Sequence, residues 1–165
     1  MSAATGTLAA RANRWLSRFE SALRKRDARA LRALFHADCH WRDLLALTWD
    51  LRTVSGADGV VSELIRHAGS ARAFAVDQAR TPPREVKRAG EECVEAIFRF
   101  DAPDGPGAGV LRLRDGKAWT LLTVLNELQG NEEHVGHRRP KGQAYSRDFA
   151  GPNWLDQRKT RAEYR

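Results

Sequence analysis

Residues 110–126 read VLRLRDGKAWTLLTVLN, and this stretch decides the fold class more than any other part of the chain. Apolar and polar side chains alternate through its first half, which is the two-residue period of a β-strand. Asp115 and Gly116 then suit the positive φ angles of a two-residue turn that matches the twist of a β-hairpin. The stretch therefore predicts two antiparallel strands, Val110–Arg114 and Lys117–Asn126.

The same period extends towards the N-terminus. It predicts one strand at residues 74–76 and another at residues 94–100. Pro82 and Pro83 mark the break after the first of these strands, because neither residue can donate a hydrogen bond to a ladder. Residues 102–108, rich in glycine and proline, are expected to form a loop between two long strands. The glycines of this loop lack the spacing of a phosphate-binding motif, and no helix is expected after them.

The first third of the chain shows a helical period instead. A stripe of apolar side chains predicts a helix over residues 7–25: Leu8, Ala12, Trp15, Leu16, Phe19 and Leu23. Asp27 suits the N-cap of a second helix that ends about residues 36–38. The hydroxyl of Ser55 is placed to cap a third helix over residues 57–67. The whole pattern predicts an α+β domain, with three N-terminal helices packed on a curved antiparallel sheet.

Length and composition fit one domain followed by an arm. A chain of 165 residues with 42% hydrophobic content can build one sizeable core, which we assign to residues 1–130. Residues 131–165 lose all periodicity, yet large apolar side chains recur there: Tyr145, Phe149, Trp154, Leu155 and Tyr164. We therefore expect an extended arm that docks onto another surface, with Trp154 and Leu155 as its contacts.

Charge and apolar content limit the kinds of partner and the location that we expect for the chain. The formal net charge is +7, but the basic side chains of residues 1–37 take solvent positions on amphipathic helices, so we expect no nucleic-acid partner. The apolar runs are too short to span a membrane, and a bacterial cytoplasmic location fits the Ala- and Arg-rich composition better than a transit peptide does.

Cys39 and Cys93 are expected as buried, reduced thiols. His36, Cys39 and His40 lack a second ligand pair, so no metal is expected.

The order of elements carries a resemblance to a known superfamily. Three helices followed by long antiparallel strands and a tight hairpin resemble the cone-shaped fold of the nuclear-transport-factor-2-like (NTF2-like) superfamily. That superfamily includes ketosteroid isomerase and the SnoaL-like polyketide cyclases. The resemblance implies a small-molecule pocket, or the remnant of one, between the curved sheet and the helices.

Three strings carry a closer likeness: FHADCHWRDLLALTWDLRT at residues 35–53, KAWTLLT at residues 117–123 and GPNWLD at residues 151–156. They look like the N-terminal region of bacterial and fungal flavin-containing monooxygenases, and the likeness spans nearly the whole chain. It implies that FAD and NADPH bind to a following domain, with no cofactor bound by this chain itself. The expected partner is that flavin- and NADPH-binding domain or a second copy of this chain. The sequence leaves open whether the chain is a fragment or the product of its own gene.

Residues 40–53 concentrate the candidates for a site. In isomerases of the resembled superfamily an aspartate in an apolar pocket abstracts a proton, which makes Asp43 and Asp50 the candidate catalytic residues. The structural alternative pairs Asp43 with Arg52, or Asp50 with Arg42, and pins an irregular connection. Adjacent arginines would also lower the pKa of either carboxyl and make it a poorer base. The expected pocket-lining residues are His40, Trp41, Trp49, Arg52 and Trp119.

Two hypotheses of different class follow. The first is an accessory domain of a flavin monooxygenase, which is not redox-active alone. The second is a stand-alone pocket protein with isomerase- or hydrolase-like activity on a small molecule.

Overall fold

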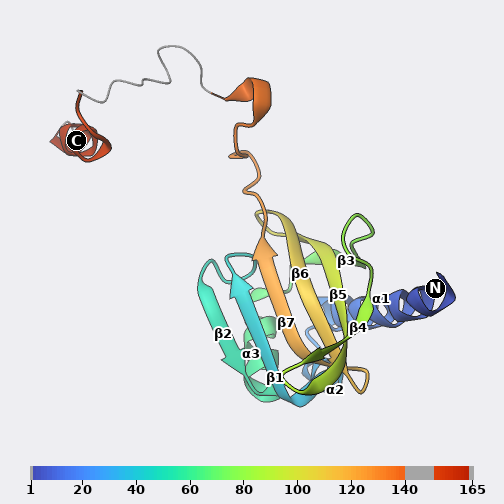
Figure 1. Ribbon diagram of the computed structural model, residues 1–165. Coiled ribbons are helices and arrows are strands. Elements are labelled where there is room, and N and C mark those ends of the chain that lie inside the picture. Colours follow the sequence, from blue (N-terminus) through green and yellow to red (C-terminus); the bar gives the residue numbers. More distant parts are fainter. Residues whose placement is uncertain (1, 140–150, 164–165) are drawn as a thin grey trace. The chain divides into compact units, whose positions relative to one another are not determined.

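The computed structural model describes residues 2–139 and 151–163. The chain divides into two compact units, residues 1–132 and residues 133–165. The first unit holds three helices and a seven-stranded sheet (Figure 1). The predicted α+β class, with helices first and the sheet after, is confirmed.

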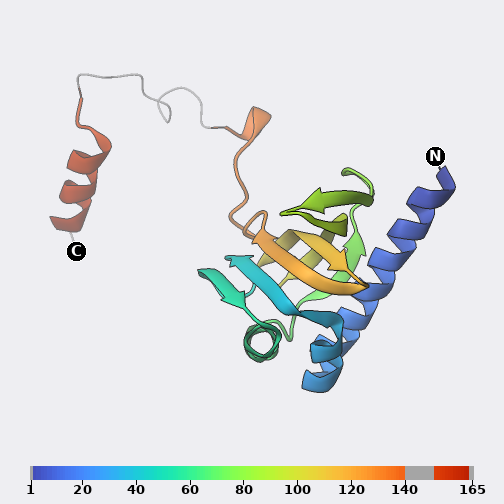
Figure 2. The same cartoon turned by 60° about the horizontal axis from the view of Figure 1, so that its bottom comes forward.

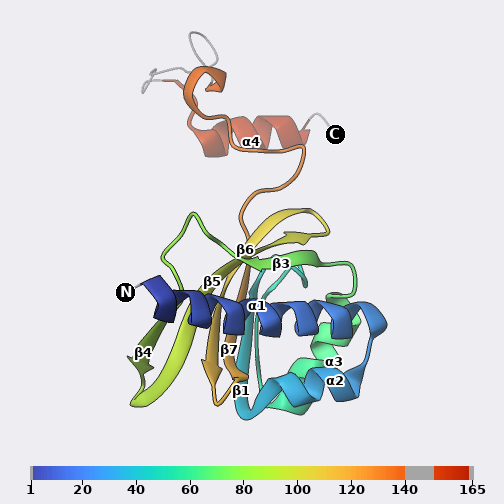
Figure 3. The same ribbon diagram turned by 90° about the vertical axis from the view of Figure 1, so that its right-hand side faces the viewer.

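Three helices lie on one face of the sheet (Figures 2 and 3). They are α1 (Ser2–Lys25), α2 (Ala28–Leu34) and α3 (Ala57–His67). Asp27 caps α2 as predicted, because its Oδ1 accepts a hydrogen bond from the backbone N–H of Ala30 at 2.9 Å. The predicted Ser55 cap of α3 is wrong. Gly56 holds that position with φ 81°, and the Ser55 hydroxyl lies 2.8 Å from His40 Nδ1.

The strands form a single sheet in the order β2-β1-β7-β6-β5-β3, with β4 paired to β5. Their bounds are β1 Phe35–Leu44, β2 Leu51–Ser55, β3 Arg72–Val76, β4 Arg84–Arg88, β5 Glu91–Ala102, β6 Gly105–Arg114 and β7 Lys117–Leu125. All pairs are antiparallel except β1 with β7, which is parallel. The sequence pattern did not predict this pair, because the second helix was expected to continue to residues 36–38, where β1 has already begun. A parallel pair needs a long crossover, and residues 45–116 provide it.

The hairpins at the ends of β6 differ in how well the sequence predicted them. The turn between β6 and β7 is confirmed, with Asp115 at φ 51° and Gly116 at φ 76°. The predicted loop at residues 102–108 is wrong, because β5 runs to Ala102 and β6 begins at Gly105. A Cβ on Gly107 would lie 2.5 Å from the Phe100 ring. This glycine therefore serves as a strand residue over which an aromatic ring packs.

The interior between helices and sheet is filled by side chains. Six aromatic rings form its centre: Trp15, Phe19, Phe35, Phe74, Phe98 and Phe100. The rings of Phe74 and Phe100 stack with centroids 4.8 Å apart, and this packing stabilises the contact between β3 and β5. Side chains of α1 also bind the backbone of β3, since Asn13 Oδ1 accepts the N–H of Val76 at 2.9 Å.

The second unit contains a short 3₁₀ turn, Gly136–Arg138, and the helix α4 (Trp154–Glu163). The last part of the predicted arm is therefore helical. Asn153 Oδ1 accepts the N–H of Asp156, and Asp156 Oδ2 accepts the N–H of Asn153, each at 3.1 Å. This reciprocal pair is a capping box that starts α4. Tyr145, Phe149 and Tyr164 lie outside the described residues. Among the helices of residues 2–139 and 151–163, none is long and apolar enough to cross a membrane.

Candidate functional site

The residues predicted to form one site lie in three separate places. Trp41 and Asp43 point from β1 into the interior, while His40 lies on the opposite face of the same strand. Trp49 and Asp50 belong to the loop between β1 and β2. Trp119 lies on β7. Thr123 is the residue of β7 that pairs with Asp43, and Trp119 lies four residues before it, roughly 13 Å at about 3.3 Å per residue.

Asp43 is fully buried and accepts four hydrogen bonds. Its Oδ2 accepts from the N–H of Leu47 at 3.0 Å, and from both the N–H and the hydroxyl of Thr48 at 2.8 Å. Its Oδ1 accepts from the hydroxyl of Thr123, which in turn accepts from Trp41 Nε1 at 3.0 Å. Through these bonds the carboxylate holds the β1–β2 loop against β7, and both of its oxygens are engaged. A catalytic role for Asp43 stays a prediction.

The anticipated ion pairs have other partners. Arg52 binds Glu63 of α3, and its Nε lies 4.0 Å from Asp50 Oδ2. Trp49 is mostly exposed, and its Nε1 donates to Asp104 Oδ2 at 2.7 Å. These contacts fasten the loop to α3 and to the β5–β6 turn. Trp49 and Asp50 are exposed, whereas Arg52 is half-buried and stands directly opposite Asp43 in the β1–β2 pair.

Trp119 is the bulged residue of β7, since Ala118 and Thr120 pair with consecutive residues of β6. The Arg114 guanidinium carbon lies 5.3 Å from the centroid of its ring, within the range of a cation–π contact. Its Nε1 is buried and has no hydrogen-bond partner in the described part of the chain.

Strand geometry separates the three residues weighed as metal ligands. Cys39 is buried on the inner face of β1, whereas His36 and His40 alternate onto the opposite face. Burial also raises the pKa of the Cys39 thiol. Within residues 2–139 and 151–163, no group of three or more His, Cys, Asp or Glu side chains is arranged to hold a metal ion.

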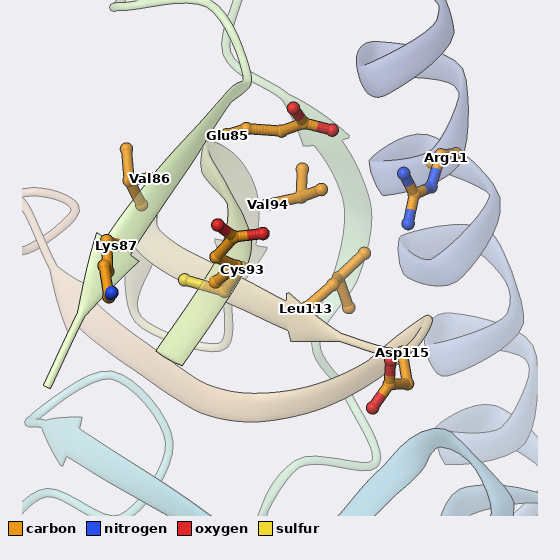
Figure 4. Close-up of a pocket in the computed structure, with 9 residues that line it drawn as sticks. Arg11, Glu85, Val86, Lys87, Cys93, Val94, Leu113 and Asp115 are labelled. Atoms are coloured by element: carbon orange, nitrogen blue, oxygen red, sulfur yellow. The ribbon is translucent and has the colours of Figure 1, made fainter. Parts of the chain in front are cut away.

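A cavity of about 440 Å³ lies between α1 and the ends of β4, β5 and β6 (Figure 4). Its lining combines apolar and charged side chains: Arg11, Glu85, Val86, Lys87, Glu92, Cys93, Val94, Leu113 and Asp115. Val94 and Leu113 pair directly across β5 and β6 and form an apolar floor. Figure 4 shows Arg11 reaching towards this space from α1. None of the residues predicted for the site lines the cavity.

The rim of this cavity carries both signs of charge. Lys87 stands directly opposite Glu92 across β4 and β5, and Glu85 stands opposite Val94. Glu85 and Glu92 are therefore diagonal neighbours on one face of the ribbon. Burial raises the pKa of the Cys93 thiol, and the nearby Arg112 opposes this effect only in part. Cys93 is consequently a poor nucleophile at neutral pH.

A buried carboxylate, Glu95, lies on β5 beside this cavity. It accepts hydrogen bonds from Arg84 at 2.9 Å, from Arg88 at 3.0 and 3.1 Å, and from Arg112 at 2.8 Å. The bond from Arg88 is the main cause that lowers the pKa of Glu95 to about 2, against the opposing effect of burial. Sequence reasoning missed this cluster, because only the register of β4, β5 and β6 brings its residues together.

Neither a family model nor a curated protein matches the sequence. Solved structures resemble the fold. A putative ketosteroid isomerase from Kribbella flavida is 14% identical with a TM-score of 0.48, over 81% of this chain and 93% of that chain. An NTF2-like protein of unknown function from Mesorhizobium loti is 17% identical with a TM-score of 0.46, over 72% and 93%. A steroid delta-isomerase from Pseudomonas aeruginosa is 21% identical with a TM-score of 0.43, over 70% and 79%.

Proposed function

We propose that the domain binds a small organic molecule in the cavity between α1 and the ends of β4, β5 and β6. The observation that supports this proposal is the combination of an apolar floor, Val94 and Leu113, with a charged rim. Ligand sites typically occupy about 300–1,000 Å³ and combine apolar walls with a few placed polar groups. The ligand that fits is a molecule with an apolar body and a charged end.

Chemistry of the isomerase or hydrolase type would require a carboxylate that touches this ligand. Glu85 and Glu92 line the cavity, so they are better placed for such a role than the sequence-based candidates Asp43 and Asp50. The four hydrogen bonds of Asp43 are all internal to the protein. We therefore assign any acid–base role first to the two glutamates.

The proposal is tested by calorimetric titration with two probes, 4-phenylbutyrate and 4-phenylbutylamine, which share an apolar body and differ in charge. Leu113→Trp fills the floor and should abolish binding, while circular dichroism confirms that the variant folds. Arg11→Ala should weaken the carboxylate probe and spare the amine, because Arg11 supplies a positive charge at the rim. Arg24→Ala, at the other end of α1, is the matched control. Binding of either probe that Leu113→Trp leaves unchanged would refute the proposal.

The accessory-domain hypothesis is a second candidate, favoured by the C-terminal unit. Trp154 is 70% exposed and Leu155 is 44% exposed, both in the first turn of the capped helix α4. Such a pair suits a docking contact with a partner domain, and FAD and NADPH would then bind to that partner. The test is to purify the chain and measure released flavin by absorbance. Stoichiometric flavin in this chain would contradict the accessory role.

A further inference from the structure

The sheet has an outer face, opposite the helices. Figure 1 looks onto this face. Because side chains alternate along each strand, the residues between the buried positions of β1, β5, β6 and β7 point outward. Two groups of side chains on this outer face are suited to binding a partner. They lie in adjacent rows that run across the paired strands.

The first group is an arginine cluster, made of Arg84, Arg88 and Arg112. Each of the three hydrogen-bonds to Glu95, yet their side chains stay 51%, 43% and 30% exposed. One carboxylate against three guanidinium groups leaves a local charge of +2. Each guanidinium has five N–H donors, and Glu95 uses only one or two of them. Glu95 thus holds the three guanidinium groups in place, and their remaining N–H groups can donate to a further anion.

The second group is an apolar row, made of Ile97, Val110 and Leu122. The register places these residues side by side on β5, β6 and β7. Each is only partly buried in the domain. Arg42 of β1 pairs with Leu122 and extends the row with an exposed positive charge. The outer face therefore offers an apolar strip with cationic groups at its side and at its end.

We propose that the outer face binds an acidic segment of a protein partner. Its apolar side chains would cover the apolar row, and its carboxylates would meet the arginine cluster and Arg42. No residue of the arginine cluster or the apolar row lines the ligand cavity, so this inference does not depend on the proposed ligand site.

Charge decides the occupant. A second copy of this chain carries a net charge of +7, so it would bring like charge to the cluster. The C-terminal unit is equally unsuited, because residues 133–165 contain eight basic and four acidic side chains. The face is formed by adjacent, half-exposed strand residues, which suits an extended segment better than a small ligand.

The experiment uses a fluorescein-labelled peptide of 12 residues in which Glu alternates with Leu, and a version with Lys in place of every Glu. Fluorescence anisotropy measures binding to the whole chain at low and high salt. We expect the Glu peptide alone to bind, with its affinity falling about tenfold between 50 and 500 mM NaCl because salt screens exposed charges. Arg42→Glu should weaken binding at least about fivefold. Arg42 is exposed and is not one of the three arginines that bind Glu95, so the variant leaves the arginine cluster intact. Arg24→Glu, on α1, makes the same charge change elsewhere and should not alter the affinity.

Amide chemical-shift changes on adding the Glu peptide should cluster on β1 and β4 to β7, the strands that hold Arg42, the arginine cluster and the apolar row. Equal affinity for both peptides would overturn the proposal. So would equal weakening by Arg42→Glu and Arg24→Glu, or shift changes confined to the helices. A dimer that sediments at twice the mass and is dissociated by Arg42→Glu would show that a second copy covers the face.

Discussion

Glu95→Gln should lower the stability of the domain at neutral pH and have little effect in acid. The pKa of Glu95 falls from its ordinary 4.5 to about 2, mainly because Arg88 hydrogen-bonds to the carboxylate. A carboxylate with a depressed pKa in the folded state contributes stability at pH values above its unfolded pKa. That contribution is lost as the pH falls through the folded pKa. At about 1.4 kcal/mol for each pKa unit, Glu95 contributes about 3 kcal/mol near pH 7.

The assay is urea unfolding of the wild type and the variant at a series of pH values from about 7 down to about 3. Glu95→Gln should be less stable by about 3 kcal/mol at pH 7, and the difference should shrink steadily below about pH 5. Glu92→Gln is the matched control, because Glu92 is an exposed carboxylate on the same strand. A difference that stays constant across this pH range would refute the electrostatic reasoning. It would leave the lost packing of the side chain as the cause.

Three further outcomes follow from burial and close contact. Asp43→Ala should destabilise the domain by about 3–5 kcal/mol in urea unfolding, since the amides of Leu47 and Thr48 lose their acceptor, whereas Asp50→Ala should change stability by less than about 0.5 kcal/mol. Gly109→Ala should cost about 2–4 kcal/mol, because the new Cβ would lie 2.2 Å from the carbonyl oxygen of Leu122; a melting temperature equal to that of the wild type would contradict the strand packing. Cys39 and Cys93 should react with iodoacetamide at least about tenfold more slowly in the folded protein than in urea, because burial raises both thiol pKa values.

Local signals predicted the fold where one element contains its own determinants. Asp115-Gly116 specified a hairpin turn, and Asp27 specified a helix start, because both act within a few residues. Gly107 failed as a signal because a glycine-rich stretch is typical of a loop. Its strand position depends on the Phe100 ring of a neighbouring strand, which no local pattern reveals.

The candidate site was harder to predict, because it depends on strand register. In the sequence, the concentration of polar and aromatic side chains at residues 40–53 predicts a site there. The alternation along β1 sends Asp43 inward and His40 outward, so the two cannot share a surface. The cavity instead joins α1 to β4, β5 and β6, and Arg11 lies far from Leu113 in sequence. Only the tertiary arrangement brings these residues together.

The most direct test of the central claim is a search for intermolecular nuclear Overhauser effects between 4-phenylbutyrate and the methyl groups of the domain. The cavity places the floor residues Val94 and Leu113 within reach of a bound apolar ring. We expect contacts from the phenyl protons to the methyl groups of both residues, and their loss in Leu113→Trp. Contacts confined to other methyl groups, or none at saturating probe, would contradict it.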